Sequence, residues 1–425
     1  MSNNNYTQRT KVSIIGGGIS GCIVAYQLSE LGYEVSLFEK KDKLGGTIRD
    51  VRENNEVFYN GPQYFYKNSN WIKKLKKINF FKSCFQEFNG SYIKKKKVNV
   101  FKSYVDLFNT VDVNHLFAQP STKLKFKKLK LNKESKLLKG RLNSYQGNIK
   151  KPLEDWCKGF SSHYQNLHES CAEILNVTRV FFSRDKNKVK IMKENNNLAD
   201  KLLGLPMLAD KEYFCVPKKG YDKFFQELEK LLRKKISIHL NSKIKIENDN
   251  NNYIKVFNHD QQIKSDKIIW AANPIPLMNE LKFNKLDNPI VRTKIYCANI
   301  KFEEKYNCNN FYIQVFSKKS NIYRIYIYKL NNKLKITIET FMRAQNNVLD
   351  IKFLNNLFLK FQIKIKTLGN FVEKKEVRHI LITKNDYNKF MKFEEKFRDT
   401  NLIGGGWHLF GRDNKINYIM KYFQN

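Results

Sequence analysis

The segment from Gly16 to Gly21 holds the first residues whose type and spacing indicate chemistry. Its sequence, Gly-Gly-Gly-Ile-Ser-Gly, contains the spacing G-x-G-x-x-G. Gly16 permits a tight turn, Gly18 lets a pyrophosphate approach the backbone, and Gly21 lets the following helix pack closely on the preceding strand. Ile19 and Ser20 lie between these glycines and belong to the same predicted site, and the N-terminus of the following helix attracts phosphate through its N–H groups and its dipole. The segment therefore predicts a site for the phosphates of a dinucleotide.

An acidic residue supports the same prediction. Glu39 follows Gly21 by eighteen residues and stands at the end of an apolar run. In dinucleotide-binding folds an acid at this distance accepts hydrogen bonds from ribose hydroxyls. Lys40 comes next and belongs to the same predicted site.

A strand–helix–strand unit must position these residues. Lys11–Ile15 is a short apolar run that predicts a buried parallel strand. Cys22–Leu31 predicts a helix closed by Gly32, and Glu34–Phe38 predicts the second strand. Strand, helix and strand in this order indicate an α/β fold with a doubly wound, Rossmann-like parallel sheet.

A second pair of glycines bears on the choice between FAD and NAD. The stretch from Glu39 to Gly46, which ends in Leu44-Gly45-Gly46, resembles the extended fingerprint of FAD-binding proteins of the glutathione-reductase type. In that family the paired glycines and the basic residue after them, here Arg49, lie near the FAD pyrophosphate and the flavin. NAD-dependent dehydrogenases with the first motif ordinarily lack the second. The resemblance therefore implies that Gly45 and Gly46 bind FAD.

Three further segments resemble the superfamily of FAD-dependent amine oxidases, protoporphyrinogen oxidases and UDP-galactopyranose mutases. Val216–Tyr221 is similar to its Pro-x-x-Gly-Tyr segment, and Asp266–Pro274 to the strand that returns the chain to the FAD domain. Near the end of the sequence, Gly411 and Arg412 with Tyr418 resemble the closing segment around the flavin in the mutases. The resemblance implies that these three residues contact the cofactor.

Within that superfamily the sequence most resembles the mutases. Tyr59–Asn68 looks like their "Y-G-P-H-x-F-H-T-N" segment, and it includes Gly61 among the implied cofactor contacts. Gln63 stands where the mutases have a histidine against the flavin. Glutamine keeps hydrogen-bonding capacity but cannot take up a proton. The resemblance therefore places Gln63 at the reacting centre with an altered redox environment.

Two arginines on predicted strands complete this resemblance. Arg324, in Ile322–Ile325, matches the "Y-T-R-I" segment whose arginine contacts the nucleotide diphosphate, and Arg292 matches an earlier "Y-R-T" strand. A guanidinium suits this role because its planar fork holds phosphate bidentately. The alternative is that both are ordinary exposed cations of strands.

The sequence pattern indicates three parts. We expect a discontinuous FAD domain from residues 1–90, 213–285 and 370–425, and a mostly helical insert at 91–212. Between Pro289 and Phe341 the apolar period becomes two, and Asn331–Asn332 reads as a hairpin turn. Residues 286–369 therefore predict an antiparallel substrate domain.

Composition limits the possible functions but does not identify one. The formal net charge is +38, but lysine is spread along the whole chain and no nucleic-acid-binding motif accompanies it. We expect no specific nucleic-acid partner. Contact with an anionic membrane surface stays open, although a solvated basic face explains the lysine-rich stretches as well. No run of eighteen apolar residues occurs.

Cysteines and histidines indicate neither disulfides nor a metal site. The seven cysteines are scattered without a CxxC pair, which fits reduced thiols and a cytoplasmic protein. The seven histidines lack metal-ligand spacing, and His408 stands out by its place in the glycine-rich stretch before Gly411.

Three functions remain open at this level. The first is a UDP-galactopyranose-mutase-like isomerase that uses reduced FAD on a nucleotide sugar, with Arg324 and Arg292 holding the diphosphate. The second is an FAD-dependent oxidase or desaturase of the amine-oxidase type, with an apolar or amine substrate. The third is a non-catalytic flavin-binding or anionic-surface-binding protein. The sequence gives no oligomeric state.

Overall fold

The computed structural model describes residues 9–61, 65–66, 69–77, 85–89, 92–95, 98–101, 136–143, 147–175, 177, 191, 213–248, 253–283, 286–287, 290–303, 310–315, 320–341, 348–360, 364–409 and 411–424. Two units emerge, each assembled from separate stretches of chain. Unit 1 comprises residues 1–49, 221–287 and 385–425, and unit 2 comprises residues 50–220 and 288–384. The predicted boundaries differ, because residues 50–90 and the predicted insert both group with the antiparallel sheet.

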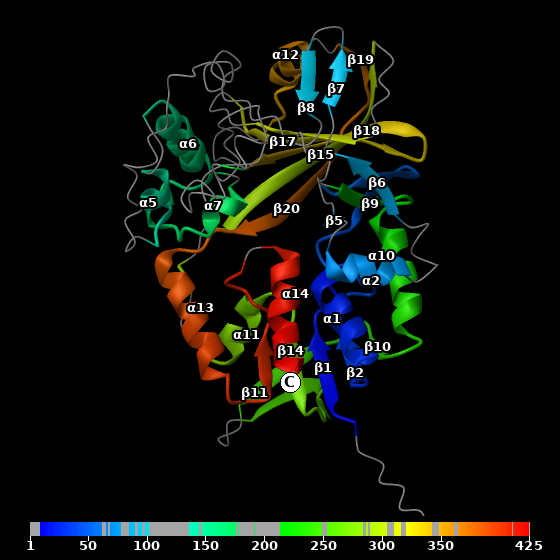
Figure 1. The fold of residues 1–425 in the computed structure, drawn as a ribbon, viewed down its shortest axis with the longest axis vertical. Coiled ribbons are helices and arrows are strands. Elements are labelled where there is room, and N and C mark those ends of the chain that lie inside the picture. Colours follow the sequence, from blue (N-terminus) through cyan, green and yellow to red (C-terminus); the bar gives the residue numbers. More distant parts are fainter. Residues whose placement is uncertain are drawn as a thin grey trace, which may run out of the picture. The chain divides into compact units, whose positions relative to one another are not determined.

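A five-stranded parallel sheet forms the centre of unit 1 (Figure 1). Its strands, in spatial order, are β10 (Ser237–His239), β2 (Glu34–Phe38), β1 (Lys11–Ile15), β14 (Lys267–Trp270) and β21 (Leu402–Gly404). The bounds of β1 and β2 agree with the predicted ones, because each is a short buried run of Val, Ile, Leu or Phe that ends at glycine or acid. The parallel sheet confirms the predicted α/β fold.

Helices and a small sheet complete unit 1. The helices are α1 (Ile19–Glu30), α10 (Tyr221–Leu232), α11 (Pro274–Glu280), α13 (Lys384–Lys396) and α14 (Arg412–Met420), followed by the 3₁₀ turn η4 (Lys421–Phe423). The small antiparallel sheet contains β11 (Ile244–Asn248), β12 (Ile254–Asn258) and β13 (Gln261–Ile263). Helix α1 begins three residues before its predicted start, so Gly21 lies inside its first turn.

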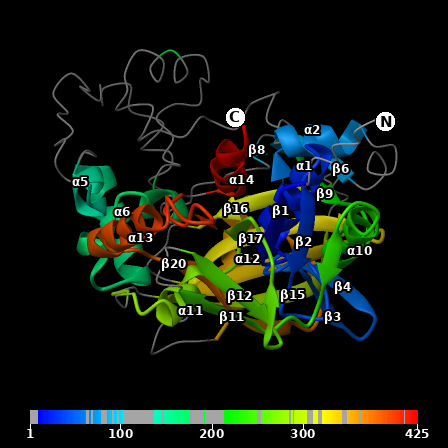
Figure 2. The ribbon, with the colours of Figure 1, turned by 90° about the horizontal axis from the view of Figure 1, so that it is seen from below.

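Unit 2 is built on a six-stranded antiparallel sheet, whose long strands β15 and β17 also stand out in Figure 2. The strands are β15 (Ile290–Phe302), β16 (Asn310–Gln314), β17 (Ile322–Leu330), β18 (Lys333–Phe341), β19 (Ile365–Leu368) and β20 (Val372–Ile380). Asn331 and Asn332 both have positive φ, at 52° and 60°, so they form the tight turn that the sequence predicts between β17 and β18.

The two faces of this sheet differ in character. One face packs an apolar core of Ile, Leu and Phe side chains, including Ile325, Ile336 and Ile338, against α12 (Ile351–Lys360). The other face carries buried polar side chains, among them Tyr328, Thr337 and Glu339. A sheet that buries polar groups on one face needs partners for each of them.

Smaller elements of unit 2 come from the first half of the chain. They are β3 (Asp50–Glu53), β4 (Glu56–Tyr59), β5 (Phe65–Tyr66), β6 (Phe85–Asn89), β7 (Tyr92–Lys95), β8 (Val98–Phe101), β9 (Tyr213–Pro217), α2 (Asn70–Lys77), α5 (Leu138–Leu142), α6 (Gly147–Phe160), η2 (Tyr164–Asn166) and α7 (Cys171–Ile174). The antiparallel pair β7–β8 lies at the beginning of the stretch predicted to be mostly helical, and its Tyr, Ile, Val and Phe residues favour strands. No helix in the described ranges is long and apolar enough to span a bilayer.

Candidate cofactor-binding site

Three neighbouring parallel strands of unit 1, β1, β14 and β21, end at the same edge of the sheet. Ile15 pairs with Trp270, and Trp270 pairs with Gly404, in parallel register. The segments that follow them therefore leave the same carboxyl edge as neighbours. In open α/β sheets, ligands bind at this edge.

The first segment is the predicted glycine turn, and its shape excludes side chains at two positions. Gly16 has φ +113°, and a Cβ there would lie 2.8 Å from the backbone nitrogen of Ala272. A Cβ on Gly21 would lie 2.0 Å from the carbonyl oxygen of Gly16. Gly16 and Gly21 thus let α1 start close against the sheet, as the motif predicts.

Gly18 differs from its neighbours because it faces open space. A Cβ built on it meets no described atom within 4 Å, although its φ of −72° suits any residue. Gly18 is the N-cap of α1, no side chain caps the helix there, and no acid occupies the first turn. The first N–H groups of a helix lack intrahelical partners. Ile19 and Ser20 therefore offer donors to an anion beside a glycine that leaves room for it.

Glu39 is buried and ties the turn to the next strand. Its Oε2 accepts from the backbone N–H of Gly17 at 2.8 Å, and its Oε1 accepts from Lys41 at 3.0 Å. A carboxylate can accept more than one hydrogen bond per oxygen. The predicted ribose contact stays a prediction, while the bond to Gly17 is a second role that the sequence does not reveal. Lys40 is exposed beside it.

The second glycine pair packs directly on the first. Gly45 donates its N–H to the carbonyl oxygen of Gly17 at 2.9 Å, and a Cβ on Gly46 would lie 3.1 Å from the Cα of Gly18. Both residues have positive φ, at 124° and 60°. The two motifs that the sequence places far apart thus form one backbone surface.

Two side chains near this surface add to the site. Arg49 donates from Nη2 to the carbonyl oxygen of Lys43, and its buried Nε has no hydrogen-bond partner among the described residues. A buried guanidinium donor without a partner fits a bound anion. The thiol of Cys22 lies 3.4 Å from the carbonyl oxygen of Gly17, and burial raises its pKa well above the ordinary value. The contact of this thiol stabilises the turn, and the sequence alone did not indicate it.

The third segment at this edge contains the remaining predicted cofactor residues of unit 1. Gly411, with φ +87°, is the N-cap of α14, and Arg412 is its first helical residue. Because β21 is parallel to β1, α14 begins at the same edge as α1, and the two helices pack together (Figure 1). Tyr418 lies in the last turn of α14, and its hydroxyl donates to Oε2 of Glu394 at 2.9 Å.

Comparisons with known proteins agree with this geometry at the N-terminus. The family model described as "NAD(P)-binding Rossmann-like domain" matches residues 14–77. A 4,4'-diapolycopen-4-al dehydrogenase of Metabacillus indicus is 50% identical over 52 residues, which are 12% of this chain and 11% of that protein. A probable UDP-galactopyranose mutase of Klebsiella pneumoniae is 33% identical over 64 residues, which are 14% of this chain and 17% of that protein. The matches thus cover less than a fifth of each of these relatives.

Solved structures extend the likeness to nearly the whole chain. A putative protoporphyrinogen oxidase from Exiguobacterium aligns with TM-score 0.62 at 12% identity, covering 98% of both chains. A reduced UDP-galactopyranose mutase aligns with TM-score 0.66 at 13% identity, covering 97% of this chain and 95% of that one. The chain has the fold of the FAD-dependent amine-oxidase and protoporphyrinogen-oxidase superfamily. The predicted fold is thus confirmed, and FAD stays the cofactor that the resemblance predicts.

The predicted mutase-like residues lie in unit 2. Gly61 has φ +89° and follows β4, and Gln63 lies outside the described residues. Arg292 is exposed on β15, where it pairs in register with Val377 of β20. Their predicted roles stay predictions.

Arg324 has a partner that the sequence does not show. Its Nε lies 3.3 Å from Oε2 of Glu339 on the neighbouring strand β18, and its guanidinium carbon lies 4.9 Å from the ring centre of Tyr323. The Glu339 side chain is 1% exposed and that of Arg324 is 16% exposed. Arg324 is therefore neither an exposed strand cation nor an uncompensated positive charge.

Next to this pair, aromatic rings fill the space between α6 and the sheet. Trp156 and Phe160 of α6 contact Tyr323 and Phe341, with ring centroids 4.5–6.4 Å apart. Tyr323 and Phe341 are almost fully buried. Buried aromatic rings therefore pack beside the Arg324–Glu339 ion pair in this part of unit 2.

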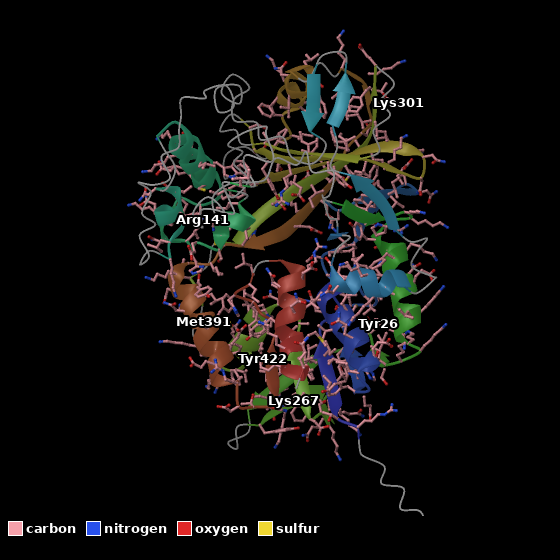
Figure 3. All side chains as sticks on the ribbon, viewed as in Figure 1. Tyr26, Arg141, Lys267, Lys301, Met391 and Tyr422 are labelled. Atoms are coloured by element: carbon pink, nitrogen blue, oxygen red, sulfur yellow. The ribbon has the colours of Figure 1, made fainter. Side chains whose placement is uncertain are left out.

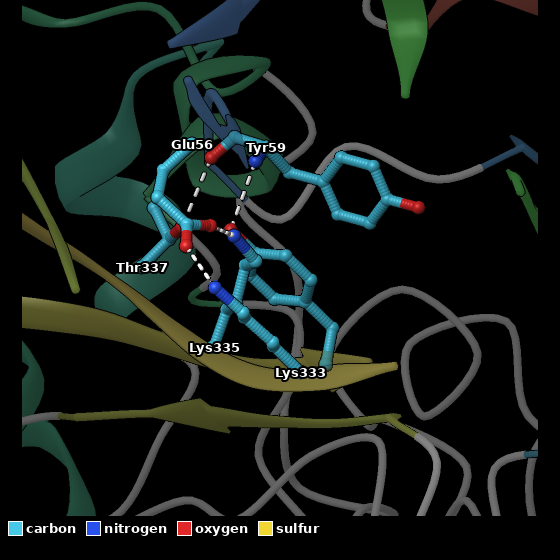
Figure 4. Close-up of polar contacts among 6 residues, drawn as sticks. Glu56, Tyr59, Lys333, Lys335 and Thr337 are labelled. Atoms are coloured by element: carbon cyan, nitrogen blue, oxygen red, sulfur yellow. Dashed lines mark hydrogen bonds and ion pairs between the residues drawn. The ribbon is translucent and has the colours of Figure 1, made fainter. Parts of the chain in front are cut away.

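A second ion-paired group of unit 2 supports its structure. Glu56 on β4 contacts the ammonium groups of Lys333 and Lys335 (Figure 4). The ammonium nitrogen of the buried Lys335 also lies 4.3 Å from the ring centre of Phe58. Hydrogen bonds from both lysines lower the pKa of Glu56 to about 2. These ion pairs hold the β3–β4 hairpin against the main sheet. Among the residues that the structure describes, no group of three or more metal-ligating side chains occurs.

Proposed function

We propose that this chain is an FAD-dependent oxidoreductase of the oxidase or desaturase type. The observation that carries the proposal is the open space over Gly18 at the uncapped start of α1, with Gly45 and Gly46 packed on the same turn. A pyrophosphate fits there, because helix N–H groups and a side-chain-free backbone face it. The Nε of Arg49, which has no hydrogen-bond partner in the described part of the chain, is a further donor for it.

Bound FAD would supply a two-electron acceptor, and the chain would supply position and electrostatics. Ile19 and Ser20 would donate backbone N–H groups to the phosphates. Glu39 would accept from the ribose while it holds Gly17. The hydrogen bond between Gly45 and Gly17 would keep the two glycine segments in the spacing that a dinucleotide requires.

The substrate side favours an uncharged or amine substrate over a nucleotide diphosphate. Arg324, the predicted diphosphate ligand, is paired with the buried carboxylate of Glu339. A doubly charged phosphate group would approach that carboxylate as well as the guanidinium, so much of the attraction would cancel. The Trp156, Tyr323 and Phe341 rings beside the pair are almost fully buried and add no charge that could attract a phosphate.

The proposal is tested by reconstitution and turnover. The purified chain is incubated with FAD, freed of excess cofactor, and examined for a bound flavin spectrum and for bleaching by candidate substrates under anaerobic conditions. Amines and unsaturated apolar compounds are the first substrate panel, with oxygen consumption and peroxide release as readouts. A chain that binds FAD but whose flavin no panel member reduces would contradict the oxidoreductase assignment and favour the non-catalytic flavin-binding alternative.

The mutase-like reaction remains the second candidate. Arg324 lies on the strand where the resemblance places a phosphate-binding arginine, and part of its side chain reaches solvent. Reduction with dithionite followed by UDP-galactose tests it, with the furanose isomer as the product to detect. Formation of that isomer would favour the mutase over the oxidoreductase.

A further inference from the structure

The glycine-rich segment after β21 is held by one buried carboxylate. Glu394 of α13 is 7% exposed, and its Oε1 accepts from the backbone N–H of Trp407 at 3.3 Å. Its Oε2 lies 2.9 Å from the Tyr418 hydroxyl and 2.9 Å from Nδ1 of His408. A single side chain thus contacts the loop twice and the following helix once.

The loop leaves little room for any other arrangement. A Cβ on Gly404 would lie 3.2 Å from Cγ of Glu394, and one on Gly405 would lie 2.7 Å from the carbonyl oxygen of Trp270. Gly406 has φ +64°, and a Cβ there would lie 3.1 Å from the Tyr418 ring. The three glycines therefore let the backbone pass between Glu394, Trp270 and Tyr418.

The side chains that Glu394 contacts are themselves enclosed. The His408 ring lies edge-on to Tyr387 and Tyr418, with centroids 6.1 Å and 5.3 Å away. The Tyr418 hydroxyl also lies 3.2 Å from that of Tyr422, a residue of η4 that is labelled in Figure 3. A buried carboxylate with several donors is costly to replace, because each donor loses its acceptor.

This loop stands next to the proposed FAD surface. Gly404 is in register with Trp270 and, through it, with Ile15, the residue before the glycine turn. Two strand spacings separate β1 from β21, which is roughly 10 Å. The loop leads to Gly411 and the start of α14, the segment whose resemblance implies flavin contact.

We infer that Glu394 is a positioning residue for the cofactor: it fixes the loop at residues 404–409 as the second wall of the FAD site. The inference rests on the proposed FAD binding. Removal of the carboxylate would release the loop backbone at Trp407 and the last turn of α14 at Tyr418, so FAD affinity would fall while the parallel sheet stays formed.

The test compares E394A, E394Q and the control E395A. Glu395 is the exposed neighbour on the same helix, so its removal leaves the loop contacts intact. FAD dissociation constants from flavin fluorescence, the visible spectrum of bound flavin, and thermal unfolding without FAD are measured for each. E394A is expected to weaken FAD binding at least tenfold, E394Q to recover most of that loss through its remaining acceptor oxygen, and E395A to match the unaltered chain.

A second variant covers the case in which E394A does not fold. Y418F removes only the hydroxyl that donates to Glu394 and is expected to weaken FAD binding severalfold. Unchanged FAD affinity in a folded E394A, or in Y418F if E394A does not fold, would overturn the inference. Failure of the unaltered chain to bind FAD would instead overturn the cofactor proposal, so the two failures are distinguishable.

Discussion

Nε of Arg324 and Oε2 of Glu339 lie 3.3 Å apart across neighbouring strands, with the carboxylate almost fully buried. The pair joins β17 to β18 on the polar face of the unit 2 sheet. A buried carboxylate beside a cation changes what that cation can bind, because an incoming anion meets both charges. The relationship separates the two proposed reactions.

The first prediction concerns phosphate binding at this pair. Neutralising the carboxylate in E339Q leaves the Arg324 charge uncompensated, so UDP affinity is expected to rise about fivefold, or roughly 1 kcal/mol. R324M is expected to lower any UDP binding to background. Isothermal titration with UDP checks both. Equal UDP affinity of E339Q and the unaltered chain, with a loss in R324M, would mean that Arg324 already binds phosphate and would favour the mutase.

The second prediction contrasts two glycines of the turn. G18A places a methyl group in the space over the turn without meeting protein atoms, so the chain should fold normally and lose FAD affinity at least tenfold, about 1.4 kcal/mol. G21A drives a methyl group into the carbonyl of Gly16, so the fold itself should lose about 2–4 kcal/mol. Thermal unfolding without FAD and flavin titration separate the effects. A G18A protein that binds FAD normally would refute the proposed phosphate position.

The third prediction compares two lysines on one carboxylate. Lys335 is fully buried, whereas Lys333 is 59% exposed, and both contact Glu56 (Figure 4). K333M is expected to change the free energy of unfolding by less than about 0.5 kcal/mol, since exposed ion pairs contribute little. K335M removes a buried ammonium group from Glu56 and is expected to cost about 1–3 kcal/mol. Urea unfolding at neutral pH measures both, and equal effects would contradict the assigned burial.

Glu56 also gives a pH dependence. Its pKa is lowered from 4.5 to about 2, so its stabilising contribution is complete above pH 4.5 and is lost as the pH falls toward 2. Because the side chain is partly exposed, solvent screening limits this contribution to about 1 kcal/mol. E56Q should flatten the stability profile in that window. An unchanged slope between pH 4.5 and 2 in E56Q would show that other groups cause the acid loss.

His168 is expected to make stability depend on pH in a different range. Burial, followed by repulsion from Lys136 and Lys384, lowers its pKa from 6.5 to about 4. The unfolded chain therefore binds a proton more readily, so stability falls as the pH drops from 6.5 toward 4, by on the order of 2 kcal/mol. H168Q should remove this fall, and the exposed His163 changed to Gln should not. Identical profiles for both variants would contradict the assignment.

The sequence predicts those parts of the fold that depend on neighbours in the chain. Val12, Ile14 and Ile15 form a short apolar run before glycine, and the run is β1. Asn331–Asn332 dictates its own turn because asparagine tolerates positive φ. The glycine turn is predictable in part for the same reason, since a Cβ on Gly21 would meet the carbonyl oxygen of Gly16 five residues earlier.

Elements without a local signal could not be predicted. Strand β20, Val-Glu-Lys-Lys-Glu-Val-Arg-His-Ile, carries five charged residues and is a strand only because β15 pairs with it. The β3–β4 hairpin had a usable signal that was missed, because Asn54 and Asn55 have the same positive-φ turn as Asn331 and Asn332. Strand β20 therefore depends on a long-range pairing, whereas the β3–β4 hairpin depends on a local turn.

Site contacts between distant segments also escape sequence reasoning. Glu339 is fifteen residues from Arg324 along the chain, and nothing in its local sequence marks it as a buried acid. Glu394 likewise lies in a charged helix whose composition predicts only a solvated face. Their roles follow from which strand and which loop they meet after folding.

The late position of β21 has a consequence for synthesis. This strand and α14 complete unit 1 with residues 402–420, whereas the glycine turn is made within the first 21 residues. During translation the turn emerges long before its sheet neighbour β14 and the loop that faces it. On the proposed FAD site, we expect a nascent chain to retain flavin only after almost all of these residues have left the ribosome, and a polypeptide cut short before Leu402 should be colourless even though it contains every residue of the N-terminal motif.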